Sequence, residues 1–208
     1  MEPKKQRSSS DVTSTSASRG YQMRKRREDV EETRQRIVDA AVELHGSVGP
    51  AQTTISAIAE LAGVQRSTLY RHFADEVAVF GACLSQWFED HPWPAASAWE
   101  LVADPAERLG VALGELYGYY DVNRAMLGNV VRDMAAMPPF VEELMRAQVT
   151  ATHEALMAPW SAVAERERLA AAVWLAIDFR AWQSLDEAGL TSDAAAELMT
   201  EMLGPFRA

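Results

Sequence analysis

The chain has 208 residues, of which 48% are hydrophobic and 24% are charged, and its formal net charge is −10. This length suits one or two globular domains, and the apolar share is enough for a sizeable core. The single cysteine, Cys83, excludes an internal disulfide framework and a cysteine-built zinc site. The histidines lack the short spacing of a local metal motif, and no apolar run approaches the roughly 20 residues of a membrane span. The basic N-terminus leads into serine and threonine rather than into the apolar segment of a signal peptide. We therefore expect a soluble cytoplasmic protein.

Charge is divided unevenly along the chain. Residues 1–80 hold 12 Lys and Arg against 11 Asp and Glu, whereas residues 81–208 hold 8 against 19. The first 27 residues carry 8 basic and 2 acidic side chains. This distribution suits a protein that contacts nucleic acid only through its N-terminal part, although solubility alone also accounts for an acidic chain.

The pattern of residues predicts three regions, 1–29, 30–75 and 76–208. Residues 1–29 are rich in Ser, Lys and Arg and have almost nothing apolar to bury, so we expect a disordered basic extension. A helical pattern begins near Val30, with apolar residues on one face, and ends at Gly49-Pro50.

Two short helices are predicted next. Thr53-Thr54 begins the first of them, because a threonine hydroxyl can accept hydrogen bonds from the exposed amides of a first turn. Gly63 ends it, and a third helix runs from Gln65 to Phe73 with Leu69 on its inner face. Three helices joined this closely are typical of a helix-turn-helix domain.

Residues 76–208 predict a larger helical domain. They show no alternating strand pattern, and Pro and Gly lie at sensible helix boundaries. The expected helices are 76–90, 105–120, 124–134, 139–158, 166–188 and 193–206. The predicted fold class is therefore all-α, with about nine helices in total.

The third helix offers a polar face with the chemistry to read DNA. Arginine can pair bidentately with guanine, glutamine with adenine, and tyrosine or histidine can reach phosphates. A solvated helix face has a similar composition, so the surrounding motif has to decide. The outward side chains are Gln65, Arg66, Ser67, Thr68, Tyr70, Arg71 and His72.

The run from Thr53 to Phe73 supplies that motif. Its Thr-Thr helix start, its Ala62-Gly63-Val64 turn and its ending Thr-Leu-Tyr-Arg-His-Phe closely resemble the DNA-binding domain of TetR-family transcriptional regulators. The resemblance covers roughly residues 33–80. It implies a homodimer that binds a palindromic double-stranded DNA operator, with contacts from Thr54, Ser56, Gln65, Arg66, Ser67, Thr68, Tyr70, Arg71 and His72.

The chain departs from the family at one position. Many members carry a lysine three residues after the phenylalanine, where this chain has Glu76, which cannot hold a phosphate by charge. Our hypothesis is that the basic N-terminal tail replaces that anchor, since flexible arms can enter the minor groove. The alternative is an inert extension.

The resemblance also implies that the C-terminal domain contains a ligand pocket and a dimer interface. Apolar residues of the last two helices are the interface candidates: Trp174, Trp182, Leu185, Leu198, Met202 and Leu203. Aromatic, methionine and polar side chains suit a small apolar or aromatic effector, and the predicted pocket residues are Trp87, Tyr117, Tyr120, Met126, Asn129, Met134, Phe140, Gln148 and His153, with Trp99, Met137, Met145 and Met157 as further candidates. Filling of the helical core would account for the same residues. Asp133 and Asp178 could favour a cationic ligand, pair with Arg132 and Arg180, or face solvent.

The predicted function is a ligand-responsive repressor in which ligand binding shifts the fourth helix and so changes the spacing of the two recognition helices. The alternative is a dimeric regulator that is controlled by a protein partner or is constitutive, without a small-molecule ligand. An enzyme is not predicted, because GxSxG, the phosphate-binding GxxxxGK[ST] and HExxH are all missing from the sequence. We therefore expect no catalytic residue, metal or cofactor.

Overall fold

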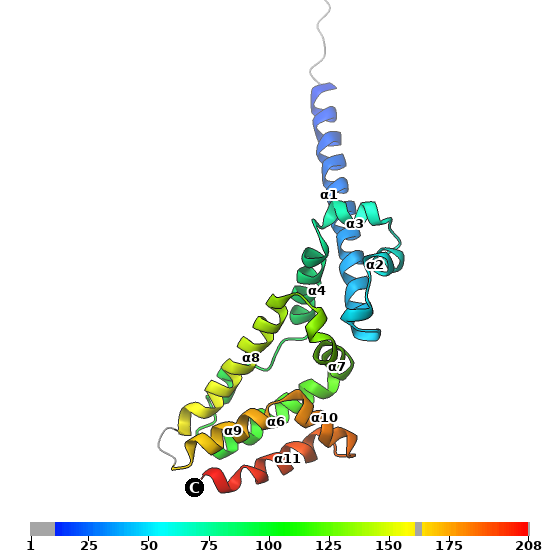
Figure 1. The fold of residues 1–208 in the computed structure, drawn as a ribbon. Coiled ribbons are helices and arrows are strands. Elements are labelled where there is room, and N and C mark those ends of the chain that lie inside the picture. The colour runs from blue at the N-terminus through cyan, green and yellow to red at the C-terminus, as the bar shows by residue number, and fades with distance from the viewer. Residues whose placement is uncertain (1–10, 161–163, 208) are drawn as a thin grey trace, which may run out of the picture. The chain divides into compact units, whose positions relative to one another are not determined.

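The fold is that of a computed structural model, which describes residues 11–160 and 164–207 (Figure 1). The described residues form eleven α-helices and no strand. They divide into two compact units, one made of residues 11–42 and 54–83 and the other of residues 43–53 and 84–207. We call these unit 1 and unit 2. Two continuous helices, α1 and α4, have residues in both units.

The first helix begins earlier than the sequence pattern predicts. Helix α1 spans Asp11–Ser47, so residues 11–29, which we expected to be disordered, are helical, and residues 1–10 of that extension lie outside the described residues. Side chains 21–32 are exposed, and one ion pair at helical spacing joins Arg24 to Glu28. The expectation equated the lack of apolar residues with the lack of a helix. Lys, Arg, Gln and Glu are good helix formers, however, and they extend a helix whose later turns are anchored in a core.

Unit 1 contains the predicted helix-turn-helix. Its other helices are α2 (Ile55–Leu61), α3 (Arg66–His72) and the first half of α4 (Glu76–Asp90). The Thr54 hydroxyl accepts a hydrogen bond from the Ala57 N–H at 3.1 Å, which confirms the predicted cap of α2. Gly63 has a positive φ of 67°, and the Arg36 guanidinium donates to the Ala62 carbonyl at 3.3 Å, so the turn between α2 and α3 is tied to α1.

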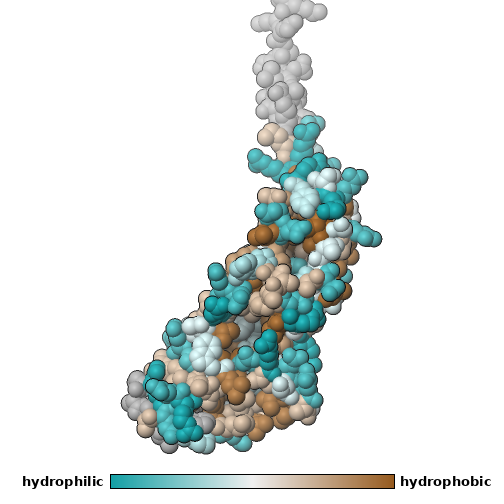
Figure 2. Space-filling view, viewed as in Figure 1, coloured by the Kyte–Doolittle hydropathy of each residue, from teal (hydrophilic) through white to brown (hydrophobic). Residues whose placement is uncertain are grey.

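Unit 2 is a helical bundle whose most extensive helix pair is α6 with α11. Its buried core contains large side chains such as Leu113, Tyr117, Tyr120 and Trp182. Figure 2 shows hydrophobic patches among the hydrophilic side chains on the visible face. The helices are α5 (Ala96–Trp99), α6 (Pro105–Val122), α7 (Arg124–Asp133), α8 (Pro139–Met157), α9 (Arg166–Ala176), α10 (Phe179–Glu187) and α11 (Ser192–Met202), with short 3-10 turns at Pro50–Gln52, Met134–Ala136, Ala158–Trp160 and Gly204–Arg207.

The single helix predicted over residues 166–188 is wrong, because the chain breaks between α9 and α10. The Asp178 carboxylate accepts a hydrogen bond from the Arg180 N–H at 2.7 Å and so begins a new helix. Two tyrosine hydroxyls satisfy carbonyls at the end of α9: Tyr117 donates to Ala176 at 2.9 Å and Tyr120 donates to Ile177 at 2.6 Å. The apolar run across the break contains neither Pro nor Gly, so the pattern alone did not reveal it.

Candidate functional site

Helix α3 presents the predicted polar face to solvent. Leu69 is fully buried and Phe73 is 4% exposed, so the opposite face of the helix is fixed in the core of unit 1. The side chains of Gln65, Arg66, Ser67, Tyr70 and Arg71 are exposed, and those of Thr68 and His72 are partly exposed. The outward set therefore shares one accessible surface, which we call the α3 face.

Two hydrogen-bond assignments bear on the α3 face and its neighbour α2. The Arg71 guanidinium donates to the Thr68 hydroxyl at 2.9 Å, which pre-orders both side chains. The Thr54 hydroxyl is engaged in capping α2, while Ser56 lies in the first turn of the same helix and is exposed. The part that each of these residues plays in DNA contact stays a prediction.

An apolar cavity of about 280 Å³ lies within unit 2, where α6, α7, α8, α9 and α10 meet. Its wall includes aromatic rings in edge contact, since the Tyr120 ring lies 5.5 Å from Phe179 and 6.0 Å from Trp93. The cavity is lined by aromatic, aliphatic and methionine side chains together with three charged ones: Trp93, Tyr120, Leu127, Val131, Met134, Glu142, Met145, Arg146, Val149, Trp174, Ile177, Asp178 and Phe179. We call this space the apolar cavity.

The structure brings Tyr120 and Met134 of the predicted pocket residues to the apolar cavity, together with the further candidate Met145. Tyr117 is instead fully buried in the core, and His153 stacks on Trp174 with ring centroids 4.4 Å apart. The other predicted pocket residues also lie outside the lining of the apolar cavity. Trp87 stacks on His91, and Met126 and Asn129 lie near the end of α1. Phe140 and Gln148 are partly buried elsewhere, and Trp99, Met137 and Met157 are buried.

The pattern predicts neither Trp93 nor Phe179 for the pocket and favours Trp174 only for the dimer interface, yet all three line the cavity. Helical periodicity tells which residues share a face, but not which of several neighbouring helices leave space between them. Asp178, which the sequence offers as a partner for a cationic ligand, also lines the cavity, and its carboxylate caps α10.

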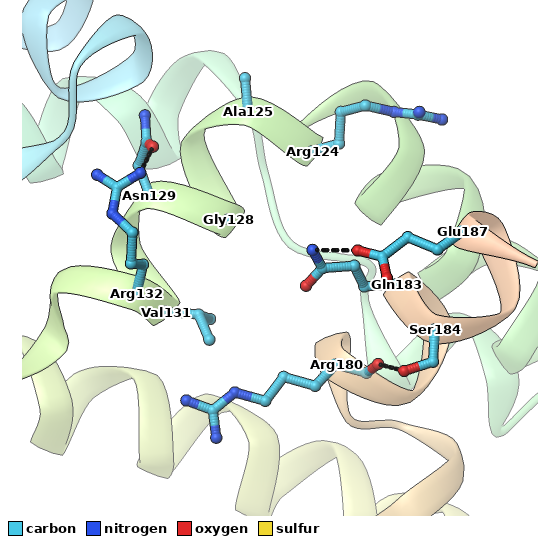
Figure 3. Close-up of a pocket in the computed structure, with 10 residues that line it drawn as sticks. All are labelled: Arg124, Ala125, Gly128, Asn129, Val131, Arg132, Arg180, Gln183, Ser184 and Glu187. Carbon is cyan, nitrogen blue, oxygen red and sulfur yellow. Dashed lines mark hydrogen bonds between the residues drawn. The ribbon is translucent and has the colours of Figure 1, made fainter.

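Polar side chains of α7 hold the end of α1. The Asn129 amide donates to the carbonyls of His45 at 3.0 Å and Gly46 at 2.8 Å. The Arg132 guanidinium donates to the Val48 carbonyl at 3.1 Å and to the Asn129 amide oxygen at 2.7 Å, and Figure 3 shows this last bond. The carbonyls of His45 and Gly46, two of the last four of α1, and the Val48 carbonyl just after the helix are therefore satisfied by α7.

The turn after α1 is fitted closely against the same helix. The Ala51 N–H donates to Asp133 Oδ2 at 3.1 Å, and the Arg132 guanidinium pairs with the same carboxylate, with Nε 2.7 Å from Oδ1. Hydrogen bonds from Arg132 and from the Ala51 N–H hold the pKa of Asp133 below its usual value. Gly49 lies between these groups with a φ of 97°, so the turn needs a residue without a side chain. We call the interactions in this and the preceding paragraph the α1–α7 contact.

A second hollow, of about 640 Å³, lies between α7 and α10 and is polar (Figure 3). Two of its three arginines are engaged in ion pairs: Arg124 with Asp121 and Asp186, and Arg132 within the α1–α7 contact. Arg180 extends into the hollow from α10 in Figure 3. This charged lining suits an apolar effector less well than the apolar cavity does.

The described residues contain no cluster of three or more His, Cys, Asp or Glu side chains that could hold a metal ion. Within the same residues, no helix is both long enough and apolar enough to cross a membrane.

Comparison with known proteins places the helix-turn-helix in a family. The family described as "Bacterial regulatory proteins, tetR family" matches residues 37–83. The helix-turn-helix of this chain is therefore similar to that of the TetR family. The HTH-type transcriptional regulator TtgR of Pseudomonas putida is 39% identical over 84 residues, which are 40% of this chain and 40% of TtgR. AcrR of Shigella flexneri is 40% identical over 57 residues, which are 27% of this chain and 26% of AcrR. The similarity to both TetR-family relatives thus spans less than half of their length.

Solved structures extend the likeness to most of the chain. A TetR-like transcriptional regulator from Rhodococcus sp. RHA1 has a TM-score of 0.58 at 22% identity and covers 83% of this chain and 93% of its own. NalD, described as the secondary repressor of the MexAB-OprM multidrug efflux pump in Pseudomonas aeruginosa, has a TM-score of 0.58 at 23% identity and covers 86% of this chain and 96% of its own. Unit 2 therefore shares the TetR-family fold, at a sequence identity that shows the fold alone.

The interface candidates divide between exposed and buried positions in the single chain. Trp182 and Leu203 are 1% and 2% exposed, so this chain already covers them. Trp174 and Met202 remain 40% and 58% exposed, as does Leu175 at 60%. Pairing of two copies through these residues stays a prediction.

Proposed function

We propose that the chain is a dimeric, sequence-specific DNA-binding regulator that represses transcription and leaves its operator when a small molecule binds. One observation carries the proposal: the α3 face is polar and exposed, while Leu69 and Phe73 fix the other side of the same helix in the core. A recognition helix needs this division, because it must be rigid and yet offer side chains to the major groove. The similarity of residues 37–83 to the TetR family supports the same interpretation.

The α3 face offers side chains of two kinds. Arg66 and Gln65 come first along the helix and can each make two hydrogen bonds to a base edge, with guanine and adenine respectively. Tyr70, Arg71 and His72 follow and have the reach for backbone phosphates. We propose that Arg66 and Gln65 supply base recognition and that the later residues position the helix on the duplex.

We propose the apolar cavity as the effector site. Leu127 and Val131 of α7 line the cavity, and other side chains of the same helix, Asn129 and Arg132, form the α1–α7 contact. A ligand that displaces α7 would act on the end of α1, a helix that continues into unit 1. This route adds to the shift of α4 expected from the sequence. A coupling free energy of about 1–3 kcal/mol between ligand binding and DNA binding would weaken DNA binding about 5- to 150-fold.

Selection from randomised double-stranded DNA tests the DNA-binding proposal, because such a selection needs no candidate operator. The purified chain should enrich one motif that contains two inverted half-sites, with centres about 34–36 Å apart along the duplex or slightly more. The inverted repeat is the expected mark of a symmetric dimer. Enrichment of a single half-site would contradict the dimer, and no enrichment at all would contradict sequence-specific binding.

The size of the apolar cavity also supports an alternative, a regulator without a small-molecule ligand. Its volume of about 280 Å³ lies just below the range of about 300–1,000 Å³ that is usual for ligand pockets. A protein partner, or no effector, would then control the regulator. Addition of small molecules that bind unit 2 to the protein–DNA complex separates the two functions, because release of DNA is expected only from a ligand-responsive repressor.

A further inference from the structure

The apolar cavity carries one unbalanced negative charge. Three ionisable side chains of Asp, Glu or Arg line it: Glu142, Arg146 and Asp178. Glu142 Oε1 lies 2.6 Å from Arg146 Nη2, so these two charges neutralise each other. Asp178 forms no ion pair with any described residue. Asp178 is exposed, and its carboxylate is therefore a charge without an opposite partner beside the apolar and aromatic groups of the lining.

Only one oxygen of the Asp178 carboxylate accepts a hydrogen bond from the described residues. Its Oδ1 accepts the Arg180 N–H at 2.7 Å, whereas Oδ2 accepts no hydrogen bond from the described residues. The guanidinium of Arg180, the basic side chain nearest in sequence, lines the polar hollow instead. Burial raises the pKa of Tyr120, and the negative charge of Asp178 is among the further causes that raise it. The field of Asp178 thus reaches a residue of the cavity wall.

Other polar groups of the lining already have partners. The Tyr120 hydroxyl donates to the Ile177 carbonyl at 2.6 Å, and the Trp93 indole N–H donates to the Thr152 hydroxyl at 3.1 Å. These two residues can therefore contact a ligand through their aromatic rings, and Trp174 and Phe179 add further aromatic surface to the lining. Aromatic faces attract cations as well as apolar surface. Apart from Arg146, which is paired with Glu142, the lining therefore lacks a positive hydrogen-bond donor.

We propose that the apolar cavity binds a small, flat apolar molecule with one cationic group, which pairs with the Asp178 carboxylate while the aromatic side chains cover the rest. A volume of about 280 Å³ favours a molecule about the size of two fused rings. Binding in the cavity can be measured without DNA, and only the role of such a molecule as the effector rests on the proposed function.

Three probes that differ mainly in charge test the proposal: 1-naphthylmethylamine, 1-naphthalenemethanol and 1-naphthoate, which are cationic, neutral and anionic at neutral pH. Isothermal titration of each into the full chain should give the tightest binding for the amine, about tenfold tighter than for the alcohol, since a charge-assisted hydrogen bond is roughly twice as strong as a neutral one. The naphthoate should bind most weakly.

Substitution Asp178→Asn removes the charge and keeps an N-cap of similar strength for α10, so the fold should persist. Its expected effect is loss of the tenfold preference, with similar binding of the amine and the alcohol. Asp104→Asn is the matched control, because Asp104 is also an exposed capping residue, accepting the Glu107 N–H at 2.8 Å, and does not line the cavity. The control should keep the preference of the wild type.

Equal or tighter binding of the alcohol or the naphthoate, or an unchanged preference in Asp178→Asn, would overturn the proposal. Failure of all three probes to bind would also overturn it and would leave a second copy of the chain as the occupant of this face. A separate outcome concerns the proposed function: if the amine binds through Asp178 but does not release operator DNA, the ligand site stands and ligand-responsive repression fails.

Discussion

Substitution of Gly49 by alanine tests how closely the α1–α7 contact is fitted. Gly49 has a φ of 97° and a ψ of 158°, a conformation that is largely restricted to glycine, so alanine should be strained by about 1–3 kcal/mol. The added Cβ would also overlap the Arg132 guanidinium and lie 2.5 Å from Asp133 Oδ2. Forcing a methyl group into filled space adds about 1–3 kcal/mol. We expect Gly49→Ala to lower the free energy of unfolding by about 3–4 kcal/mol.

Gly189→Ala separates the two effects. Gly189 follows α10 with a similar φ of 92°, but no atom lies within 4 Å of the position of an added Cβ. It should therefore show backbone strain alone, about 1–2 kcal/mol. Destabilisation of Gly49→Ala beyond the about 1–3 kcal/mol of backbone strain belongs to the steric part of the α1–α7 contact.

Urea unfolding of both variants gives the free energies, and amide hydrogen exchange gives a local readout. The Ala51 N–H donates to Asp133, so its exchange should accelerate in Gly49→Ala and stay unchanged in Gly189→Ala. Equal destabilisation of the two variants, with unchanged exchange at Ala51, would refute the reasoning that Gly49 is required by its neighbours.

Two further predictions concern buried groups of unit 2. Burial lowers the pKa of His45 to about 4, against about 6.5 in an unfolded chain, so protons favour the unfolded state as the pH falls below about 6.5. Protonation of His45 in the unfolded chain should therefore lower the free energy of unfolding by about 2 kcal/mol when the pH falls from about 7.5 to about 5. Urea unfolding at the two pH values should show this loss in the wild type and not in His45→Gln. Tyr120→Phe leaves the Ile177 carbonyl without its donor at 2.6 Å and should destabilise the fold by about 1–2 kcal/mol in thermal or urea unfolding. Tyr119→Phe, which removes a longer bond of 3.3 Å to a partly buried carbonyl, should cost less, and an equal loss in both would contradict the assignment.

The helix-turn-helix was predictable because local chemistry determines each of its parts. Thr54 caps α2, Gly63 takes the positive φ of the turn, and Leu69 and Phe73 are spaced to bury one face of α3. Each of these features needs only a few consecutive residues, so a single sequence is enough to find them.

The extent of α1 and the composition of the apolar cavity were not predictable in the same way. The exposed turns of α1 carry no apolar pattern, and they extend a helix whose later residues, from Ile37 onward, pack in the core. Tyr117 and Tyr120 lie on the same helix three residues apart, yet only Tyr120 lines the cavity. Which of them meets a space depends on how α8, α9 and α10 pack around α6, and the break at Asp178 helps to set that packing.

Fluorescence-anisotropy binding to operator DNA, with Arg66→Ala beside the wild type, tests the central claim most directly. A suitable DNA is the motif enriched by selection or the region flanking the chain's own gene, measured at about 50 mM and 200 mM salt, because phosphate contacts alone weaken steeply with salt. We expect Arg66→Ala to weaken binding by about 1–3 kcal/mol and to relax the sequence preference. Arg166→Ala, an exposed arginine at the start of α9, should leave binding unchanged. Equal affinity of wild type and Arg66→Ala for the operator, or equal affinity of the wild type for operator and scrambled DNA, would contradict recognition of DNA by the α3 face.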